Sequence, residues 1–336
     1  MIKKYSLLTE FINILLICLI GYINFSSQSV SWVLTLISAI ILTVIFTKDT
    51  IKKSIFYFAF TILGSFAVYY FQTDVRDTDL LLNTCIRILD LALPAFVLNL
   101  CLRSKKMNLG KVLYFTSGAN LFVNLLSLTK IKYYDKINMM DTIDVFYNEL
   151  IDTYKTVLSG NYAFNTINID EIIPVFNIIK EITVMLIPAF LIILCMAVSY
   201  ILIVATRGML KVYSNRDYSN IEYFYQISVG RFLSTITLIF LIVALLFGSE
   251  YFVSAIYNFV FVACFIYFVN GVSVIYFFMI KKLRGLFAAK ILTAVILILS
   301  LISVALIPTF NGISILFVIG LMDSTVNFRK LKKVGE

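Results

Sequence analysis

The stretch Asn83–Arg103, NTCIRILDLALPAFVLNLCLR, has the length and hydrophobicity of a membrane span, yet it contains basic and acidic residues and a proline. About 20 helical residues at ~1.5 Å each cover the ~30 Å hydrocarbon layer of a bilayer. Arg87 and Asp90 are three residues apart, so on a helix they share a face and can form an ion pair. Ionisable side chains inside a span normally face protein or water, which makes this pair a candidate functional site. The alternative is structural, with Arg87 reaching the outer surface and Asp90 only holding it.

The composition of the whole chain is that of a membrane protein. Of its 336 residues, 61% are hydrophobic and only 14% are charged, whereas a soluble domain has about 25% charged residues. We therefore predict an all-α fold, a polytopic bundle of transmembrane helices. Apolar segments predict about ten spans, at residues 8–25, 31–47, 54–72, 83–103, 111–129, 180–205, 231–249, 252–280, 286–307 and 309–325.

Several residue types and motifs that enzymes use are missing from the sequence. The chain has no His, which is the commonest general base and a common metal ligand. Its five Cys are scattered singly through apolar segments, without the paired spacing of a zinc site or a disulfide framework. HExxH, GxSxG and P-loop motifs are absent as well. We therefore expect no enzymatic activity, no metal and no cofactor, and only Asp90 supports an intramembrane enzyme.

The positions of the basic residues predict the orientation of the chain. Most of the 28 Lys and Arg residues fall in alternate connections, which the positive-inside rule assigns to the cytoplasm. These cytoplasmic segments are Lys3–Lys4, Lys48–Lys53, Arg103–Lys111, Arg207–Arg231, Lys281–Lys290 and Arg329–Lys333. We expect a multi-pass protein of the cell membrane with both termini in the cytoplasm. The formal charge of +9 lies in short clusters between apolar segments, where it meets anionic lipid headgroups of the cytoplasmic face rather than nucleic acid.

One long, acidic connection interrupts the short ones, at residues 131–179. Within it, residues 141–158 carry apolar side chains at the spacing of an amphipathic helix, with Asp141 as N-cap and Gly160 as C-terminal stop. A second helix is expected to begin near residues 168–170, with Pro174 in its first turn. The connection either lies on the outer membrane surface or covers a substrate site. We accordingly divide the chain into a five-span bundle (1–130), an external helical loop (131–179) and a second five-span bundle with a basic tail (180–336).

Polar residues inside the predicted spans extend the candidate site. Asn120 and Asn124 are four residues apart and share one face of the fifth span. With Arg87 and Asp90 they form the predicted ligand-binding set. The alternative for Asn residues in a span is an interhelical hydrogen bond worth ~0.6–2 kcal/mol. The other polar residues in or near the spans are Asn99, Asn258, Asn270, Lys290 and Asp323, of which Asp323 is expected to pair with Arg329 or Lys330.

Three stretches of the C-terminal half carry a family resemblance. They are IKEITVMLIPAFLIILCMAVSYILIVATRGMLKVY (179–213), NGVSVIYFFMIKK (270–282) and PTFNGISILFVIGLMDSTVNFRKLKK (308–333). In this order they resemble the YybS-like family of predicted multi-span membrane proteins from Gram-positive bacteria. Members tend to carry Gln at the position of Asn270, and Trp and Pro in the inner segment that is rich in Tyr here. The family has no assigned activity, so the resemblance implies location and architecture but no reaction.

The layout of the first five or six spans is also similar to two other kinds of membrane protein. These are the substrate-binding subunits of energy-coupling-factor vitamin transporters and the shape-determining protein MreD. The transporter subunits usually carry an Ala motif on the first helix for docking their partner. Residues 11–25 contain only Gly21 and Cys18 as small residues, which counts against the transporter interpretation.

Two functional hypotheses follow from these patterns. The first is an integral membrane protein that binds or transports a small solute at Arg87, Asp90, Asn120 and Asn124. The second is a non-transporting scaffold or regulatory subunit that recruits a membrane-protein partner at the cytoplasmic face. Its contacts would be the basic tail and the segment 206–230, which contains Tyr213, Tyr218, Tyr223 and Tyr225.

The predicted topology is tested with reporter fusions. A reporter fused after Glu336 is expected to lie in the cytoplasm, and one inserted at Gly160 is expected to lie outside, because alternate connections carry the basic residues. At each position, phosphatase activity and fluorescence of paired reporters are measured in intact cells. An external C-terminus would require an odd number of spans and would contradict the assignment.

Overall fold

The protein is described by a computed structural model. The structure describes residues 2–26, 32–48, 50–72, 78–104, 107–159, 169–214, 223–246, 250–283, 285–306 and 311–330. All the regular structure in these ranges is helical. The predicted C-terminal stop at Gly160 lies outside the described residues.

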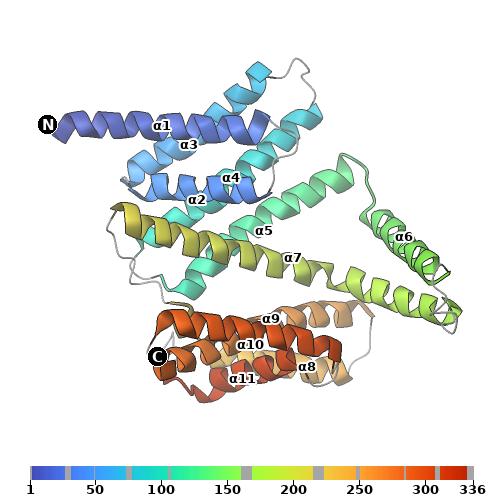
Figure 1. The fold of residues 1–336 in the computed structure, drawn as a ribbon. Coiled ribbons are helices and arrows are strands. Elements are labelled where there is room, and N and C mark those ends of the chain that lie inside the picture. Colours follow the sequence, from blue (N-terminus) through green and yellow to red (C-terminus); the bar gives the residue numbers. More distant parts are fainter. Residues whose placement is uncertain are drawn as a thin grey trace. The chain divides into compact units, whose positions relative to one another are not determined.

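The described residues form eleven α-helices, of which α6 is amphipathic and the others are apolar (Figure 1). Each of the ten predicted spans falls on a helix, and the polytopic helical fold class is confirmed. Within the described ranges, five helices meet the length and hydropathy of a membrane span, and three shorter ones are apolar. The helices are α1 (Ile2–Ser26), α2 (Trp32–Lys48), α3 (Ile51–Gln72), α4 (Thr78–Arg103), α5 (Leu109–Tyr133), α6 (Met139–Ser159), α7 (Ile169–Ser214), α8 (Arg231–Leu246), α9 (Glu250–Leu283), α10 (Leu286–Leu306) and α11 (Gly312–Val326), with a 3₁₀ turn η2 (Phe224–Gln226).

Side-chain caps explain where two of these helices begin. Asn108 and Asn311 have extended backbones, and their side-chain oxygens accept hydrogen bonds from the N–H groups three residues later, which the first turn of a helix leaves unpaired. Helix α6 begins two residues before the predicted N-cap. Asn138 accepts from the backbone N–H of Met140 at its start, so Asp141 lies in the first turn instead. Helix α7 begins at the predicted place, but Pro174 lies inside it rather than in its first turn.

The chain forms two compact units that do not follow the order of the sequence. Unit 1 contains Met1–Ile137 and Leu194–Ile221, and unit 2 contains Asn138–Ile193 and Glu222–Glu336. The long helix α7 contributes its C-terminal part to unit 1 and its N-terminal part to unit 2. Residues 138–179 of the predicted external loop therefore group with unit 2, and residues 131–137 with unit 1.

In unit 1, helix α4 packs against α2, α3 and α5, and α1 packs against α3. The core side chains of α4 are fully buried at Ile88, Leu91 and Leu98. Rings of Phe46, Phe58 and Phe96 fill the space between α2, α3 and α4, with centroids 4.5 to 6.4 Å apart.

Arg103, the last residue of α4, joins three helices at one end of unit 1. Its guanidinium donates to the side chain of Asn99 at 2.8 Å, to the backbone oxygen of Phe46 at 2.6 Å and to the hydroxyl of Ser54 at 2.7 Å. At the same end, Lys53 forms an ion pair with Glu10. Arg103 and Lys53, from two of the segments that the sequence assigns to the cytoplasm, therefore lie at the same end of this unit.

In unit 2, helix α9 is central and packs against α8, α10 and α11. The contact between α9 and α11 is unusually close, because glycines replace side chains at it. A Cβ atom on Gly271 would lie 1.9 Å from the backbone oxygen of Leu316, and one on Gly320 would lie 1.9 Å from that of Tyr267. Neither position accepts any other residue without separating the two helices. Tyr267, Val229 and Ala263 form the buried core beside this contact.

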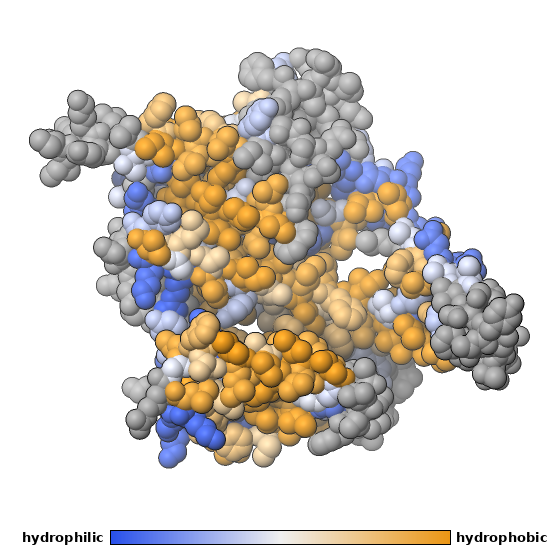
Figure 2. All heavy atoms as spheres, in the orientation of Figure 1, coloured by the Kyte–Doolittle hydropathy of each residue, from blue (hydrophilic) through white to orange (hydrophobic). Residues whose placement is uncertain are grey.

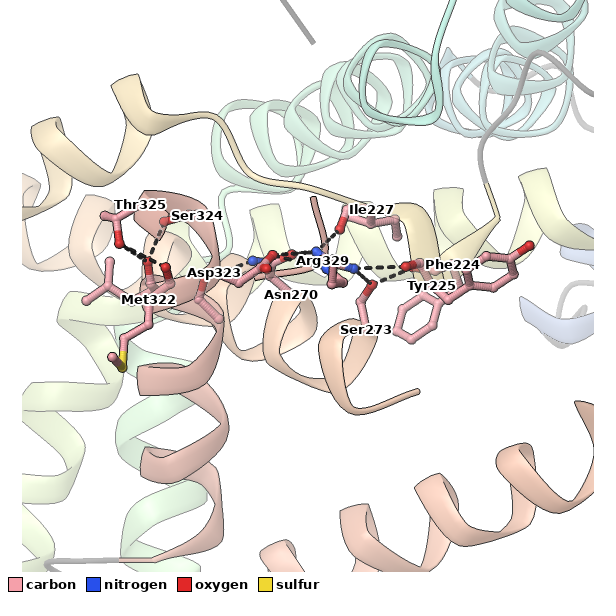
Figure 3. A network of polar contacts seen from close by, with 12 residues as sticks. Phe224, Tyr225, Ile227, Asn270, Ser273, Met322, Asp323, Ser324, Thr325 and Arg329 are labelled. Atoms are coloured by element: carbon pink, nitrogen blue, oxygen red, sulfur yellow. Dashed lines mark hydrogen bonds and ion pairs between the residues drawn. The ribbon is translucent and has the colours of Figure 1, made fainter. Parts of the chain in front are cut away.

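The Arg329 network closes one end of unit 2 (Figure 3). The Arg329 side chain is buried and forms an ion pair with Asp323 at 2.6 Å, as the sequence predicted. It also donates to Asn270 at 2.9 Å and Ser273 at 2.7 Å on α9. On the other side it donates to the backbone oxygens of Tyr225 at 2.9 Å and Ile227 at 2.5 Å. The chain after α11 and the segment before α8 are thereby tied to the same part of α9.

Helix α7 is opened in unit 2, next to Pro188. The side chain of Asn258 on α9 accepts from the backbone N–H of Ala189 at 2.9 Å and donates to the backbone oxygen of Met185 at 2.7 Å. These two backbone groups are four residues apart and bond to each other in a regular helix. The Asn258 amide is therefore inserted into the hydrogen-bond ladder of α7, an arrangement associated with helix kinks.

Helix α6 packs on the first part of α7 through polar and aromatic contacts. The Tyr147 hydroxyl bonds to that of Thr183 at 2.8 Å, and Asp144 pairs with Lys180 at 2.7 Å. Phe146 and Leu150, on the apolar face of the predicted amphipathic helix, remain exposed. This exposure agrees with a helix whose apolar side chains contact lipid.

Exposed hydrophobic side chains cover much of the described surface of each unit (Figure 2). On α10 they include Phe287, Ile291 and Leu299. A soluble protein seldom exposes apolar patches of this extent, whereas a hydrocarbon environment favours them.

The ion pair of the Arg329 network is expected to respond asymmetrically to mutation. Replacing Arg329 with Gln leaves the Asp323 carboxylate buried and unpaired, which costs about 3–5 kcal/mol. Adding Asp323→Asn removes that charge and is expected to restore most of the loss. Unfolding of the purified protein in detergent measures the free energies. Lys330→Gln is the control, since Lys330 is adjacent but exposed. A double variant no more stable than Arg329→Gln would contradict the pairing.

Candidate functional site

A cavity of about 200 Å³ lies within unit 1, between α2, α4, α5 and the part of α7 that belongs to this unit. We call it the Asp90 cavity. Both polar and aliphatic residues line the cavity. The polar residues are Thr35, Asp90, Asn120, Asn124 and Cys195, and the apolar ones are Leu36, Ala39, Pro94, Leu194, Val198 and Leu202.

Asp90 lies in the middle of α4, roughly 20 Å from the Arg103 end. Its side chain is half-buried and lines the cavity. Among the contacts of the described residues, no hydrogen bond or ion pair involves its carboxyl group. A carboxylate at this depth without a partner is energetically unfavourable, which distinguishes Asp90 from the other buried acid, Asp323.

Pro94 changes the backbone beside this carboxyl group. Proline has no N–H, so the hydrogen bond that would reach the backbone oxygen of Asp90, four residues earlier, is not made. Both residues line the cavity.

Asn120 and Asn124 bring their amide groups to the cavity from α5. The amide nitrogen of Asn120 donates to the Ser199 hydroxyl at 2.6 Å. That of Asn124 donates to the backbone oxygen of Asn120 at 2.9 Å and to the Cys195 sulfur at 3.7 Å. Because a backbone carbonyl only accepts, the nitrogen of Asn124 must face it. Both hydrogens of the Asn124 amide and one hydrogen of the Asn120 amide are therefore engaged within the protein, and the two amide oxygens remain as acceptors.

Three of the four residues predicted as a ligand-binding set meet at this cavity, and Arg87 does not. Arg87 is exposed on α4 and is not among the lining residues. In the described part of the chain, no ion pair joins it to Asp90. Arg87 and Asp90 are three residues apart on α4, but only Asp90 lines the cavity that α2, α5 and α7 border.

Sequence reasoning missed Cys195, Ser199 and Thr35 as parts of the site. Cys195 is buried, and its sulfur accepts a hydrogen bond from Asn124. Cys195 and Ser199 are four residues apart and share a face of α7. That spacing within an apolar helix was the only available signal.

The other polar residues noted in the spans are engaged in structural contacts. Asn99 accepts from Arg103, and Asn258 bridges the opening in α7. Asn270 donates to the backbone oxygen of Gly320 at 2.8 Å and accepts from Arg329. Lys290 is exposed on α10. No cluster of three or more Cys, Asp or Glu that suits a metal ion occurs among the residues that the structure describes.

Comparison with known proteins identifies the family. The family described as "Predicted membrane protein (DUF2232)" matches residues 11–324, which is nearly the entire chain. The chain belongs to this family, in agreement with the YybS-like resemblance of its C-terminal half. No curated protein and no solved structure matches it.

The hydrogen bond between Asn120 and Ser199 is expected to stabilise unit 1. Replacing either residue with Ala leaves a buried polar group without its partner, which costs about 1–3 kcal/mol. In a double-mutant cycle the coupling between the two changes is expected to be about 0.5–1.5 kcal/mol. Unfolding in detergent measures it, with Ser117→Ala on the same helix as control, since Ser117 bonds only within α5. Strictly additive effects would contradict a direct bond.

Proposed function

We propose that this membrane protein binds a small solute in the Asp90 cavity. The observation that carries the proposal is the meeting of Asp90, Asn120 and Asn124 around about 200 Å³ of space between apolar helices. Polar groups inside a membrane protein are unfavourable unless they find partners, and they are commonly retained where they contact a substrate. The family assignment supports the membrane location and leaves the solute open.

The size of the cavity limits the solute. Pockets for drug-sized molecules typically span about 300–1,000 Å³, and the Asp90 cavity is smaller. A smaller solute, held by few polar groups and an aliphatic wall, fits the proposal better than a lipid or a nucleotide does.

The proposed orientation places both termini and the basic segments in the cytoplasm. Two observations support it within the units. In unit 1, Arg103 at the end of α4 donates hydrogen bonds to residues at the ends of α2 and α3. In unit 2, Arg329, which follows α11, donates hydrogen bonds to Asp323 on α11 and to the backbone oxygen of Tyr225 before α8. Each set consists of segments that the positive-inside rule assigns to the same face, so anionic lipids of that face are proposed contacts of the exposed Lys residues.

A second candidate is a scaffold that recruits a membrane-protein partner at the cytoplasmic face. The observation in its favour is the aromatic pair of Tyr223 and Tyr225, whose rings stack with centroids 5.6 Å apart. Tyr223 is half-exposed, and the backbone beside it is fixed by Arg329. A rigid exposed aromatic group suits protein contacts, but the same residues also suit the headgroup region of a membrane.

A ligand screen with a cavity-filling variant tests the proposed function. Vitamins, nucleobases, amino acids and small amines are added to the purified protein, and the shift in thermal unfolding is measured. A solute at a hundredfold excess over its Kd adds about 2.7 kcal/mol of stability. Val198→Phe is expected to abolish the shift, because Val198 lines the cavity.

Val204→Phe is the matched control for this screen. Val204 lies on the same helix but is 50% exposed and does not line the cavity. The control is expected to keep the ligand shift of the unmodified protein. A shift that survives Val198→Phe, or no shift with any solute, would contradict binding in this cavity. In that case, capture of a defined membrane-protein partner that depends on Tyr223 would favour the scaffold.

A further inference from the structure

The chemistry of the Asp90 cavity indicates the class of its solute. Resting on the proposed function, we propose that the solute is a small amphipathic amine, with an ammonium head at Asp90 and an apolar body. The inference concerns charge, hydrogen-bond complementarity and shape, each of which is set by described residues of unit 1.

Charge is the first constraint. Among the described lining residues, Asp90 alone has an acidic or basic side chain. Its carboxyl group has no hydrogen bond or ion pair among the described residues, and Arg87 on the same helix is exposed and does not line the cavity. A carboxylate in a site of low dielectric constant attracts a cation strongly and repels an anion. The cavity therefore selects positive charge.

Hydrogen-bond complementarity is the second constraint. The Asn124 nitrogen donates to two acceptors within the protein, which uses both of its hydrogens. The Asn120 nitrogen donates to Ser199. The Thr35 hydroxyl, the Cys195 thiol and the second hydrogen of the Asn120 amide can also donate, but the charged group is the Asp90 carboxylate, which, like the two amide oxygens, only accepts. An ammonium group has three donors and no acceptor, so it matches this set.

Shape separates an organic amine from an inorganic cation. The apolar part of the wall, which includes Leu36, Ala39 and Leu202, provides burial for a hydrocarbon body. A divalent metal ion would need several oxygen ligands with more than one carboxylate. The described lining residues contain one carboxylate, and no acidic cluster suited to a metal occurs among the described residues.

The test uses three probes of nearly equal size that differ in charge: benzylammonium, benzyl alcohol and benzoate. Each is titrated against the full-length protein in detergent at constant ionic strength, and the apparent Kd is obtained from the shift in thermal unfolding. Benzylammonium is expected to bind about tenfold or more tightly than either analogue, because its hydrogen bonds to Asp90 are charge-assisted. This comparison needs no variant and so does not depend on a variant folding.

Two variants assign the preference to Asp90. Asp90→Asn keeps the shape of the side chain and removes its charge, and it is expected to bind benzylammonium and benzyl alcohol equally. Asp152→Asn is the matched control, since Asp152 is an exposed acid on α6 outside the cavity, and it is expected to keep the preference. Size-exclusion profiles and unliganded unfolding temperatures establish that both variants are folded.

The outcomes separate this inference from the proposed function. Equal binding of all three probes, abolished by Val198→Phe, would overturn the amine inference and leave solute binding in the cavity intact. An amine preference that persists in Asp90→Asn would overturn it as well. If no probe in the millimolar range shifts unfolding, the amine inference fails, and the broader screen with Val198→Phe and Val204→Phe decides the proposed function independently.

Discussion

The hydrocarbon layer of a membrane offers no hydrogen bonds, so every polar group at that depth depends on the protein for its partner. Within the spans, this constraint explains the bond of Asn120 to Ser199 and the bonds of Asn258 to the backbone of α7, whereas arginines act at the helix ends. Arg103 and Arg329 each satisfy several carbonyl and hydroxyl acceptors on different segments. Lipid and neighbouring helices are similarly apolar, so apolar faces alone do not define how far one helix is shifted along another. The arginine contacts fix this register at the helix ends.

Close packing supplies the complementary part of the fold. Where α9 meets α11, Gly271 and Gly320 allow the two backbones to touch. Dispersion contacts and short interhelical hydrogen bonds then replace the hydrophobic effect that drives packing in water. Asn270 lies next to Gly271, and it bonds to the backbone oxygen of Gly320. The glycine contact and the Arg329 network are therefore one continuous feature of unit 2.

Much of the fold was predictable because long apolar segments are a strong signal. The pairing of Asp323 with Arg329 was also accessible, since the two residues are close in sequence. The acceptors of Arg103 were not, because Phe46 contributes only a backbone oxygen and Ser54 an ordinary hydroxyl. Asp90, Asn120 and Asn124 stood out as polar residues in spans. Arg87 did so equally, and only the packing of α4 against its neighbours separates it from them.

The insertion of Asn258 into α7 has a consequence for the biogenesis of the protein. Helix α7 is synthesised well before α9, so the backbone groups of Met185 and Ala189 reach the membrane before Asn258 exists. During that interval α7 either keeps a regular hydrogen bond at this point or holds water there. The form of α7 that bonds to the Asn258 amide is available only after α9 has entered the bilayer. Completion of α7 is thus a post-insertion step, and its order is dictated by the direction of translation.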